Sequence, residues 1–177
     1  MDRHERFYRR SLRDILVAQG IVSAELADEL AESAYEAGES FGYAVVDAGH
    51  LTAWDLTKTV AGSYQMPVLP LAGYDYDATM LDGMSAATLY QYQVLPVGRF
   101  GRSWSFAVSE PPSRECVAAL KEAFGTALFF FVSDAELVKE MVGEHVKVVD
   151  AASDKGWHSM FDDADAAINS GTVEESE

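Results

Sequence analysis

The sequence predicts an α+β protein in which an N-terminal helical repeat subdomain is followed by a small β-β-α-β-α sandwich subdomain. Apolar residues recur at helical spacing in the first third of the chain, whereas short β-rich runs alternate with helical segments in the second half. Apolar residues make up 49% of the 177 residues, which is enough for a sizeable core. We expect a helical repeat with a closing extended segment over residues 1–71, a linker over 72–88, an α+β subdomain over 89–149, and an acidic tail over 150–177.

The helices of the repeat are predicted from two features that occur twice. Gly20 is placed to end a first short helix, and Ser23 is placed to cap the next one. Gly49 and Thr52 repeat both features 29 residues later. A hydroxyl at a helix start accepts a hydrogen bond from the backbone, and glycine ends helices because it adopts left-handed conformations. The segment 65–71, which contains two prolines, is expected to be extended.

The second half is expected to contain three strands and two helices. A capping box, formed by Ser133 and by Glu136 three residues later, predicts the start of the last helix. The expected elements are strands over 93–97 and 104–108, a turn at 98–101, a helix over 111–124, a strand over 127–132 and a helix from 135 to about 145.

The overall charge excludes nucleic acid as a general partner. Asp and Glu total 29 against 13 Lys and Arg, so the formal net charge is −16 and phosphate backbones would be repelled. No apolar run approaches the roughly 20 residues of a membrane span, so we expect no direct membrane insertion. The N-terminus lacks the apolar stretch of a signal peptide, which predicts a cytoplasmic protein.

The two ends of the chain are candidate contacts for a protein partner. The tail carries an apolar stripe at helical spacing on an acidic helix, which either folds back or docks in a partner's groove. Its candidate partner-binding residues are Trp157, Met160, Phe161 and Ile168. The basic N-terminal segment, with Arg6, Arg9 and Arg10, is the second candidate. The alternative is a solvated helix start and a disordered tail.

The sequence offers no catalytic residues and no metal site. The four histidines are scattered without the i, i+4 spacing of a helical metal site, and no nucleophile has a base at motif spacing. Asp75, Asp77 and Asp82 lie in a loop but lack the final glutamate of an EF-hand. Cys116 is expected to be a small core residue. We therefore expect a protein that is not an enzyme.

Together these residues resemble the N-terminal domain of type II secretion and type IV pilus assembly ATPases, which in some members is a cyclic di-GMP receptor. The family repeat reads R-L-G-x-x-L-V-x-x-G and, six residues on, L-x-x-x-L-x-x-Q, and it occurs twice. Copy one corresponds to residues 11–20 and copy two to 41–49. Residues 64–71 look like the strand that closes the repeat, and residues 89–146 look like the α/β portion.

The resemblance implies a dinucleotide site, which this chain matches only in part. The candidate dinucleotide-binding residues are Leu12, Arg13, Leu16, Gly20, Gly42, Val45, Gly49, Leu56 and Val60. The arginine position of copy one is Ser11, its leucine positions are Ala27 and Ala31, and the glutamine positions of the two copies are Ala34 and Ser63. Arg10 or Arg13 could replace the missing arginine, and Glu110 stands where the family has an aspartate.

The resemblance therefore predicts a non-catalytic adaptor or regulatory protein of bacteria. The phosphate-binding pattern G-x-x-x-x-G-K-[ST] of the ATPase core is absent from the sequence. We expect no cofactor and a protein partner from a secretion or pilus system, which would recruit the chain to the inner membrane. One alternative is a cyclic di-GMP receptor, and another is a structural component that self-assembles into a homo-oligomer.

Overall fold

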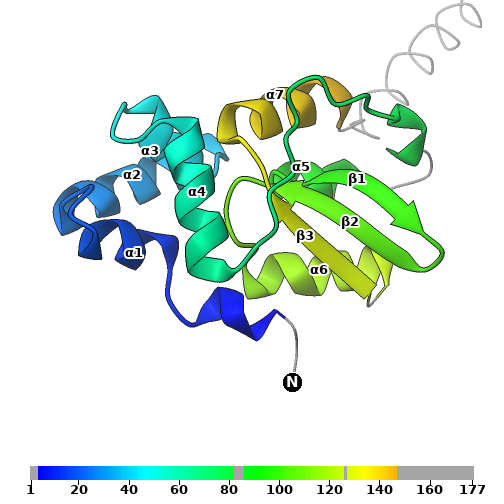
Figure 1. Cartoon of the computed structure of the whole chain (residues 1–177), viewed down its shortest axis with the longest axis horizontal. Helices are drawn as coiled ribbons and strands as arrows, with labels where there is room; N and C mark the ends of the chain where they lie inside the picture. Colours follow the sequence, from blue (N-terminus) through cyan, green and yellow to red (C-terminus); the bar gives the residue numbers. More distant parts are fainter. Residues whose placement is uncertain (1–3, 82–85, 126, 147–177) are drawn as a thin grey trace, which may run out of the picture. The chain divides into compact units, whose positions relative to one another are not determined.

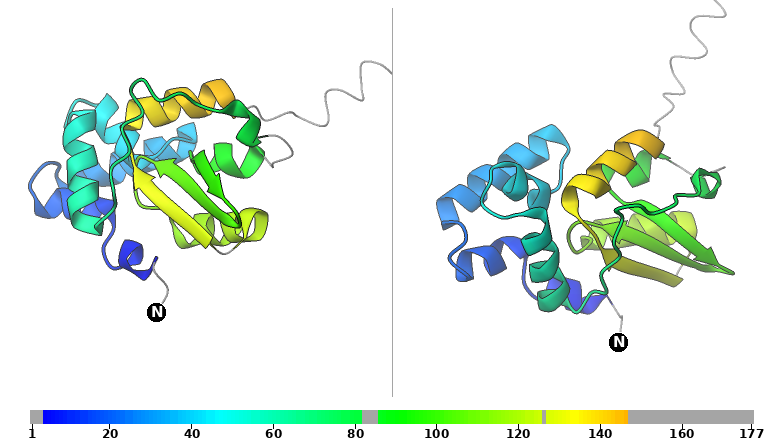
Figure 2. Two further views of the ribbon diagram at one scale, coloured as in Figure 1. Left: turned by 45° about the vertical axis from the view of Figure 1, so that its right-hand side comes forward. Right: turned by 45° about the horizontal axis from the view of Figure 1, so that its top comes forward.

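The computed structural model describes residues 4–81, 86–125 and 127–146, which belong to one compact unit, Met1–Lys147 (Figure 1). Four helices form the N-terminal part, and a three-stranded sheet with helices α6 and α7 on opposite sides forms the rest (Figures 1 and 2). The elements are η1 (Glu5–Tyr8), α1 (Leu12–Ala18), α2 (Ala24–Ala37), α3 (Phe41–Asp47), α4 (Ala53–Tyr64), η2 (Ala78–Leu81), α5 (Ala86–Gln91), β1 (Leu95–Phe100), β2 (Ser103–Val108), α6 (Arg114–Phe124), β3 (Ala127–Val132) and α7 (Ala135–His145). The α+β class predicted from the sequence is confirmed.

The 29-residue repeat governs the backbone of all four N-terminal helices. The hydroxyls of Ser23 and Thr52 cap α2 and α4, as predicted, by accepting from the N–H three residues ahead at 3.2 and 3.1 Å. Ser11 and Ser40, again 29 residues apart, cap α1 and α3 in the same way. Glycines follow α1 and α3 with φ angles of +70° and +76°, which only glycine adopts easily. The pair α3 and α4 therefore repeats the local structure of the pair α1 and α2.

The sheet has the order β1-β2-β3, with β1 antiparallel and β3 parallel to β2. Helix α6 makes the crossover that the parallel pair requires. The predicted turn at 98–101 is wrong, because β1 continues through Gly98 to Phe100 and the turn falls at residues 101–102. The register shift between Pro96 and Gly98 keeps the strand paired past the first glycine, and Gly101, with φ +59°, takes the turn instead.

The start of α7 also differs from the prediction. Its cap is Asp134, whose Oδ1 accepts from the N–H groups of Glu136 and Leu137 at 3.0 and 3.2 Å. The hydroxyl of Ser133, predicted as the cap, instead donates to the carbonyl of Leu69 at 2.7 Å. The backbone of Val132 adds two bonds to the same segment, donating to the carbonyl of Pro67 and accepting from the N–H of Leu69. The segment after the repeat is thus attached to β3.

The segment predicted as a linker, 72–88, packs on the sandwich where it is described. It contains η2 and the start of α5. The hydroxyl of Tyr74 donates to the carbonyl of Val97 at 2.7 Å. The ring of Tyr76 stacks on His145 with centroids 4.6 Å apart. These contacts hold the segment against β1 and α7.

The core is continuous between the helical part and the sandwich. Leu16 and Val45 from the repeat and Phe106 and Val132 from the sheet are fully buried in one hydrophobic cluster. Cys116 also lies in this cluster, as the sequence predicted. The rings of Trp104, Phe124 and Phe130 surround Phe106 at centroid distances of 5.3 to 6.5 Å.

Replacing Phe106 with alanine tests this core. Phe106→Ala leaves a cavity among three aromatic rings, so we expect the free energy of unfolding to fall by about 3 to 5 kcal/mol. The measurement is urea unfolding followed by tryptophan fluorescence. Phe100→Ala is the matched control, because this phenylalanine is 89% exposed and its loss should change stability by less than about 0.5 kcal/mol. Equal losses in both variants would contradict the assigned core.

Candidate functional site

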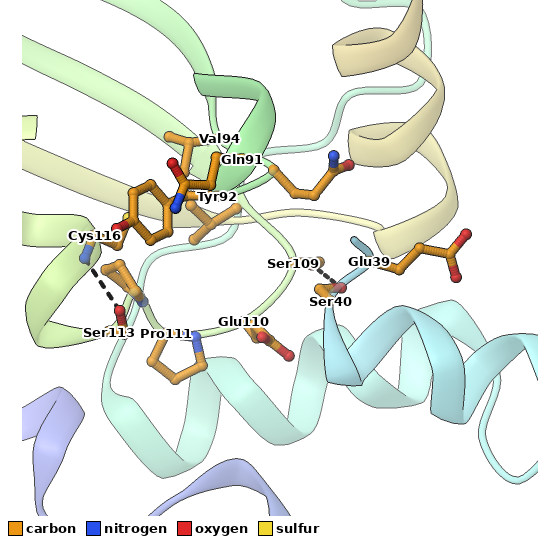
Figure 3. A pocket seen from close by; sticks show the side chains of 13 residues that line it. Glu39, Ser40, Gln91, Tyr92, Val94, Ser109, Glu110, Pro111, Ser113 and Cys116 are labelled. Carbon is orange, nitrogen blue, oxygen red and sulfur yellow. Dashed lines mark hydrogen bonds between the residues drawn. The ribbon is translucent and has the colours of Figure 1, made fainter. Parts of the chain in front are cut away.

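The connection from β2 to α6 reaches across to the second repeat copy. The hydroxyls of Ser109 and Ser40 lie 3.1 Å apart (Figure 3). A carboxylate oxygen of Glu110 accepts a 2.7 Å hydrogen bond from the backbone N–H of Gly42. Gly42 is the second residue of α3, so its N–H has no partner within the helix. A carboxylate at this point also interacts favourably with the positive end of the helix dipole. Glu110 thus provides a hydrogen-bond acceptor for a free backbone N–H at the start of α3.

Close packing favours glycine at position 42, whose φ angle is not in the left-handed region. A β-carbon at this position would lie 3.0 Å from the Cδ2 atom of Leu56 and 3.2 Å from the Oε2 atom of Glu110. Burial raises the pKa of the Glu110 carboxyl, although the backbone N–H groups of Gly42 and Phe41 act in the opposite direction. The structure thus identifies the hydrogen-bond partner of the Glu110 carboxyl as the backbone N–H of Gly42.

Two hollows lie on either side of the β2–α6 connection, and both are lined by Glu110, Pro111, Pro112 and Ser113. The first hollow, which we call the repeat groove, has a volume of about 280 Å³. It runs between the starts of α1 and α3. The second has a volume of about 220 Å³ and lies towards α5, with Tyr92 and Cys116 in its wall (Figure 3).

The structure brings only part of the predicted dinucleotide site to the repeat groove. Leu12 and Arg13 line it, and Gly42 meets it through Glu110. Four apolar candidates are buried in the core instead, where they support the repeat from inside: Leu16, Val45, Leu56 and Val60. Gly20 and Gly49 end helices and face open space. These last six residues are not among those that line the repeat groove, and their role as ligand contacts stays a prediction.

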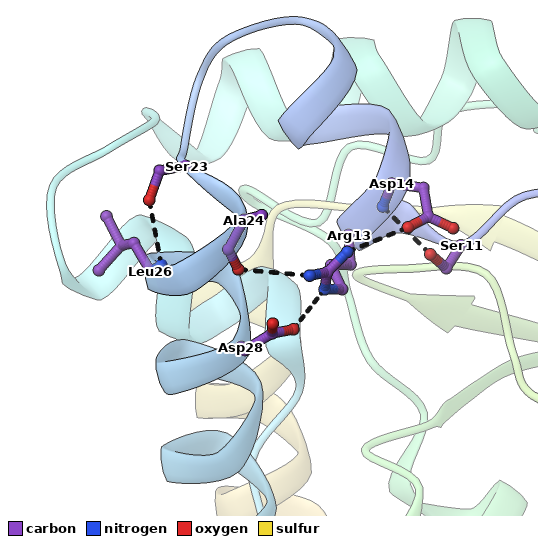
Figure 4. A network of polar contacts seen from close by, with 7 residues as sticks. All are labelled: Ser11, Arg13, Asp14, Ser23, Ala24, Leu26 and Asp28. Atoms are coloured by element: carbon purple, nitrogen blue, oxygen red, sulfur yellow. Dashed lines mark hydrogen bonds and ion pairs between the residues drawn. The ribbon is translucent and has the colours of Figure 1, made fainter.

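Arg13, the predicted substitute for the missing family arginine, is held by the first repeat copy (Figure 4). Its Nε donates to Asp28 at 2.6 Å, and its two terminal nitrogens donate to Asp14 and to the carbonyl of Ala24. The hydrogen bond from Arg13 lowers the pKa of Asp28. The guanidinium therefore bridges α1 and α2, and a ligand in the groove would have to compete with a carboxylate for it.

Arg6, Arg9 and Arg10 surround a separate hollow of about 410 Å³ below α1 and α4. The other polar residues in its wall are Gln19, Ser63, Tyr64 and Gln65. The hydroxyl of Tyr64 donates to the carbonyl of Arg10 at 2.9 Å, which fixes the arginine segment against the end of α4. We call this hollow the arginine pocket. The sequence identified its arginines as a basic segment but gave no sign that they line a concave surface.

The candidate contacts in the tail, Trp157, Met160, Phe161 and Ile168, lie outside the described residues. Within the described ranges, no group of three or more His, Cys, Asp or Glu side chains is arranged to hold a metal ion. Burial raises the pKa of the Cys116 thiol to about 12, which makes it a poor nucleophile. Among those same residues, no helix has the length and apolar character to cross a membrane.

Comparisons with known proteins agree with this architecture. Residues 64–151 match the family model of the MshEN domain. This region of the chain is therefore similar to the MshEN domain. The structure of MshE with cdg (cyclic di-GMP) superposes with a TM-score of 0.54 at 21% identity, covering 77% of this chain and 99% of the other. The N-terminal domain of XpsE superposes with a TM-score of 0.54 at 16% identity, covering 81% and 95%. The fold is therefore that of the N-terminal domain of these secretion and pilus ATPases.

A relative in sequence is the type IV pilus assembly ATPase PilB of Myxococcus xanthus, which is 23% identical over 131 residues. The match covers 74% of this chain and 23% of PilB. The chain therefore spans about a quarter of that relative. The MshEN match covers the region from the end of α4 to the end of α7, which includes Glu110 and the whole sheet.

The Glu110 contact can be tested through its pH dependence. Because burial raises the pKa of Glu110 in the folded state, its contribution to stability is present at acidic pH and is lost as the pH rises through that raised value. We expect the stability of Glu110→Gln to fall less than that of the wild type between pH 4.5 and pH 7.5. The measurement is the unfolding free energy across this range, and Glu36→Gln, on an exposed part of α2, is the control. Parallel curves for wild type and Glu110→Gln would contradict the assignment.

Proposed function

We propose that this protein is a non-catalytic docking or regulatory domain of a bacterial secretion or pilus machine, and that it acts by binding a protein partner. The observation that carries the proposal is a set of large aromatic side chains left in solvent. Phe100 at the hairpin tip is 89% exposed, Tyr35 on α2 is 87% exposed and Trp54 on α4 is 60% exposed. Exposed aromatic residues are the usual anchors of protein interfaces.

The contacts of the repeat groove support a scaffold role. Glu110 accepts from Gly42, and Arg13 is held by Asp28 and Asp14. A ligand would have to displace the Glu110 carboxyl from the Gly42 N–H and compete with two carboxylates for Arg13. The apolar stripe of the tail and the basic N-terminal segment remain the proposed partner contacts. The partner would recruit the chain to the inner membrane, and the chain itself would need no cofactor.

Purified components test the docking proposal. The chain is titrated against the assembly ATPase and the cytoplasmic platform proteins of the pilus and secretion systems of the same cell, using biolayer interferometry. We expect saturable binding to at least one, which Trp157→Ala with Phe161→Ala and, separately, Phe100→Ser weaken at least tenfold by removing aromatic anchors. Glu36→Gln is the control. Binding to none of them would refute the docking role, and unchanged affinity in the tail variant would refute the tail contact.

Cyclic di-GMP binding is the second candidate function. The repeat groove and the likeness to MshE with cyclic di-GMP favour it. The residues present fit that ligand poorly, because Ser11, Ala27, Ala31 and Ala34 stand at family contact positions and lack the side chains that the family uses there. We therefore expect calorimetric titration with cyclic di-GMP to give no saturable heat. GTP and cyclic di-AMP are the controls and should give the same result. Selective micromolar binding would instead establish a second-messenger receptor.

A further inference from the structure

The arginine pocket is a positively charged hollow in a strongly acidic protein. Among the described residues, three guanidinium groups and no carboxylate contribute to its wall. The whole chain carries 29 acidic and 13 basic residues, so an arginine on its surface would normally have an acidic residue nearby. Gathering three like charges in one concave place is unfavourable unless an anion offsets their repulsion. The composition of this wall therefore distinguishes it from the rest of the surface.

Several other basic side chains of the described residues form ion pairs with acidic side chains. Arg13 pairs with Asp28 at 2.6 Å, Lys139 with Glu39 at 2.6 Å and Arg114 with Glu5 at 3.3 Å. Arg9 and Arg10 form no ion pair within the described part of the chain, and Arg6 only packs its guanidinium 5.1 Å from the ring of Phe7. Their hydrogen-bond donors are therefore available to a ligand.

The backbone that carries these arginines is fixed in place. Phe7 is 5% exposed and packs edge-on against Phe130 at a centroid distance of 6.1 Å, which anchors η1 on the sheet. Ser11 caps α1 immediately after the arginines, and the Tyr64 hydroxyl holds the carbonyl of Arg10. The ends of the segment are therefore ordered before any ligand arrives, which lowers the entropic cost of binding.

The chemistry of the wall matches a phosphate group. A guanidinium presents a planar fork of donors that bonds two phosphate oxygens at once. The side-chain amides of Gln19 and Gln65 and the hydroxyl of Ser63 add neutral donors around the same hollow. A concave volume of about 410 Å³ suits a small anion better than the flat acidic face of a protein.

We propose that the arginine pocket binds a phosphate-bearing anion, held by Arg6, Arg9 and Arg10. The pocket is separate from the repeat groove, with which it shares only Tyr64 among the lining residues. This inference goes beyond the proposed docking function and does not depend on it, because it needs no protein partner. Either a free phosphate compound or an anionic lipid headgroup supplies the required group.

Pyrophosphate titration of the full chain tests the proposal. The ionic strength is held constant with sodium chloride, and binding is followed by calorimetry. We expect saturable binding that Arg9→Ala with Arg10→Ala weakens at least tenfold. Arg102→Ala, which removes an exposed arginine at the hairpin turn, is the control and should bind as the wild type does. Circular dichroism checks that each variant is folded.

Vesicles distinguish the two sources of phosphate. Flotation with phosphatidylglycerol vesicles is compared with flotation on phosphatidylcholine vesicles, with and without pyrophosphate. Flotation on the anionic vesicles that pyrophosphate inhibits assigns a lipid headgroup, whereas pyrophosphate binding without flotation assigns a free anion. The absence of saturable pyrophosphate binding, or an equal loss in Arg102→Ala, would overturn the proposal. Neither result bears on docking through the tail or the exposed aromatic residues, so the two proposals fail independently.

Discussion

The hydrogen bond from the Gly42 N–H to the Glu110 carboxylate is the contact on which the arrangement of this protein most depends. It joins the start of α3 in the second repeat copy to the connection that leaves the central strand β2. The bond between Ser40 and Ser109 lies beside it, and the pairing of Pro67 and Leu69 with Val132 fastens the other end of the repeat to β3. A continuous core can form between the two halves because both attachments hold them together. The same contact places a carboxyl group in the wall of the repeat groove.

Much of this fold was predictable from local signals, and the errors have local causes. The glycine and hydroxyl positions 29 residues apart predicted the repeat because caps and helix ends depend on a few neighbouring atoms. The hairpin turn was misplaced because Gly98 and Gly101 are equally suited to a turn in isolation, and only the register against β2 decides between them. Ser133 and Asp134 both make good caps, and the carbonyl of Leu69, 64 residues away, engages the serine.

The candidate site was less predictable than the fold, because it depends on contacts between distant segments. Glu110 stands at the aspartate position of the family, but no local signal could pair it with Gly42, 68 residues earlier. Leu16, Val45, Leu56 and Val60 match the family pattern, and the structure adds that all four are buried in the core. Charge explains the remaining surface. Acidic residues outnumber basic ones in the chain, so the three arginines beside α1 and α4 form a locally positive region that would attract an anion.

The most direct test of this account is the NMR resonance of the Gly42 amide proton. A carboxylate acceptor at 2.7 Å deshields this proton, and the effect weakens when the carboxyl is protonated. We expect the resonance to lie downfield, to titrate with the raised pKa of Glu110, to lose this titration in Glu110→Gln, and to stay unchanged when cyclic di-GMP is added. A Gly42 resonance that does not titrate, or one that moves with the dinucleotide, would contradict the account.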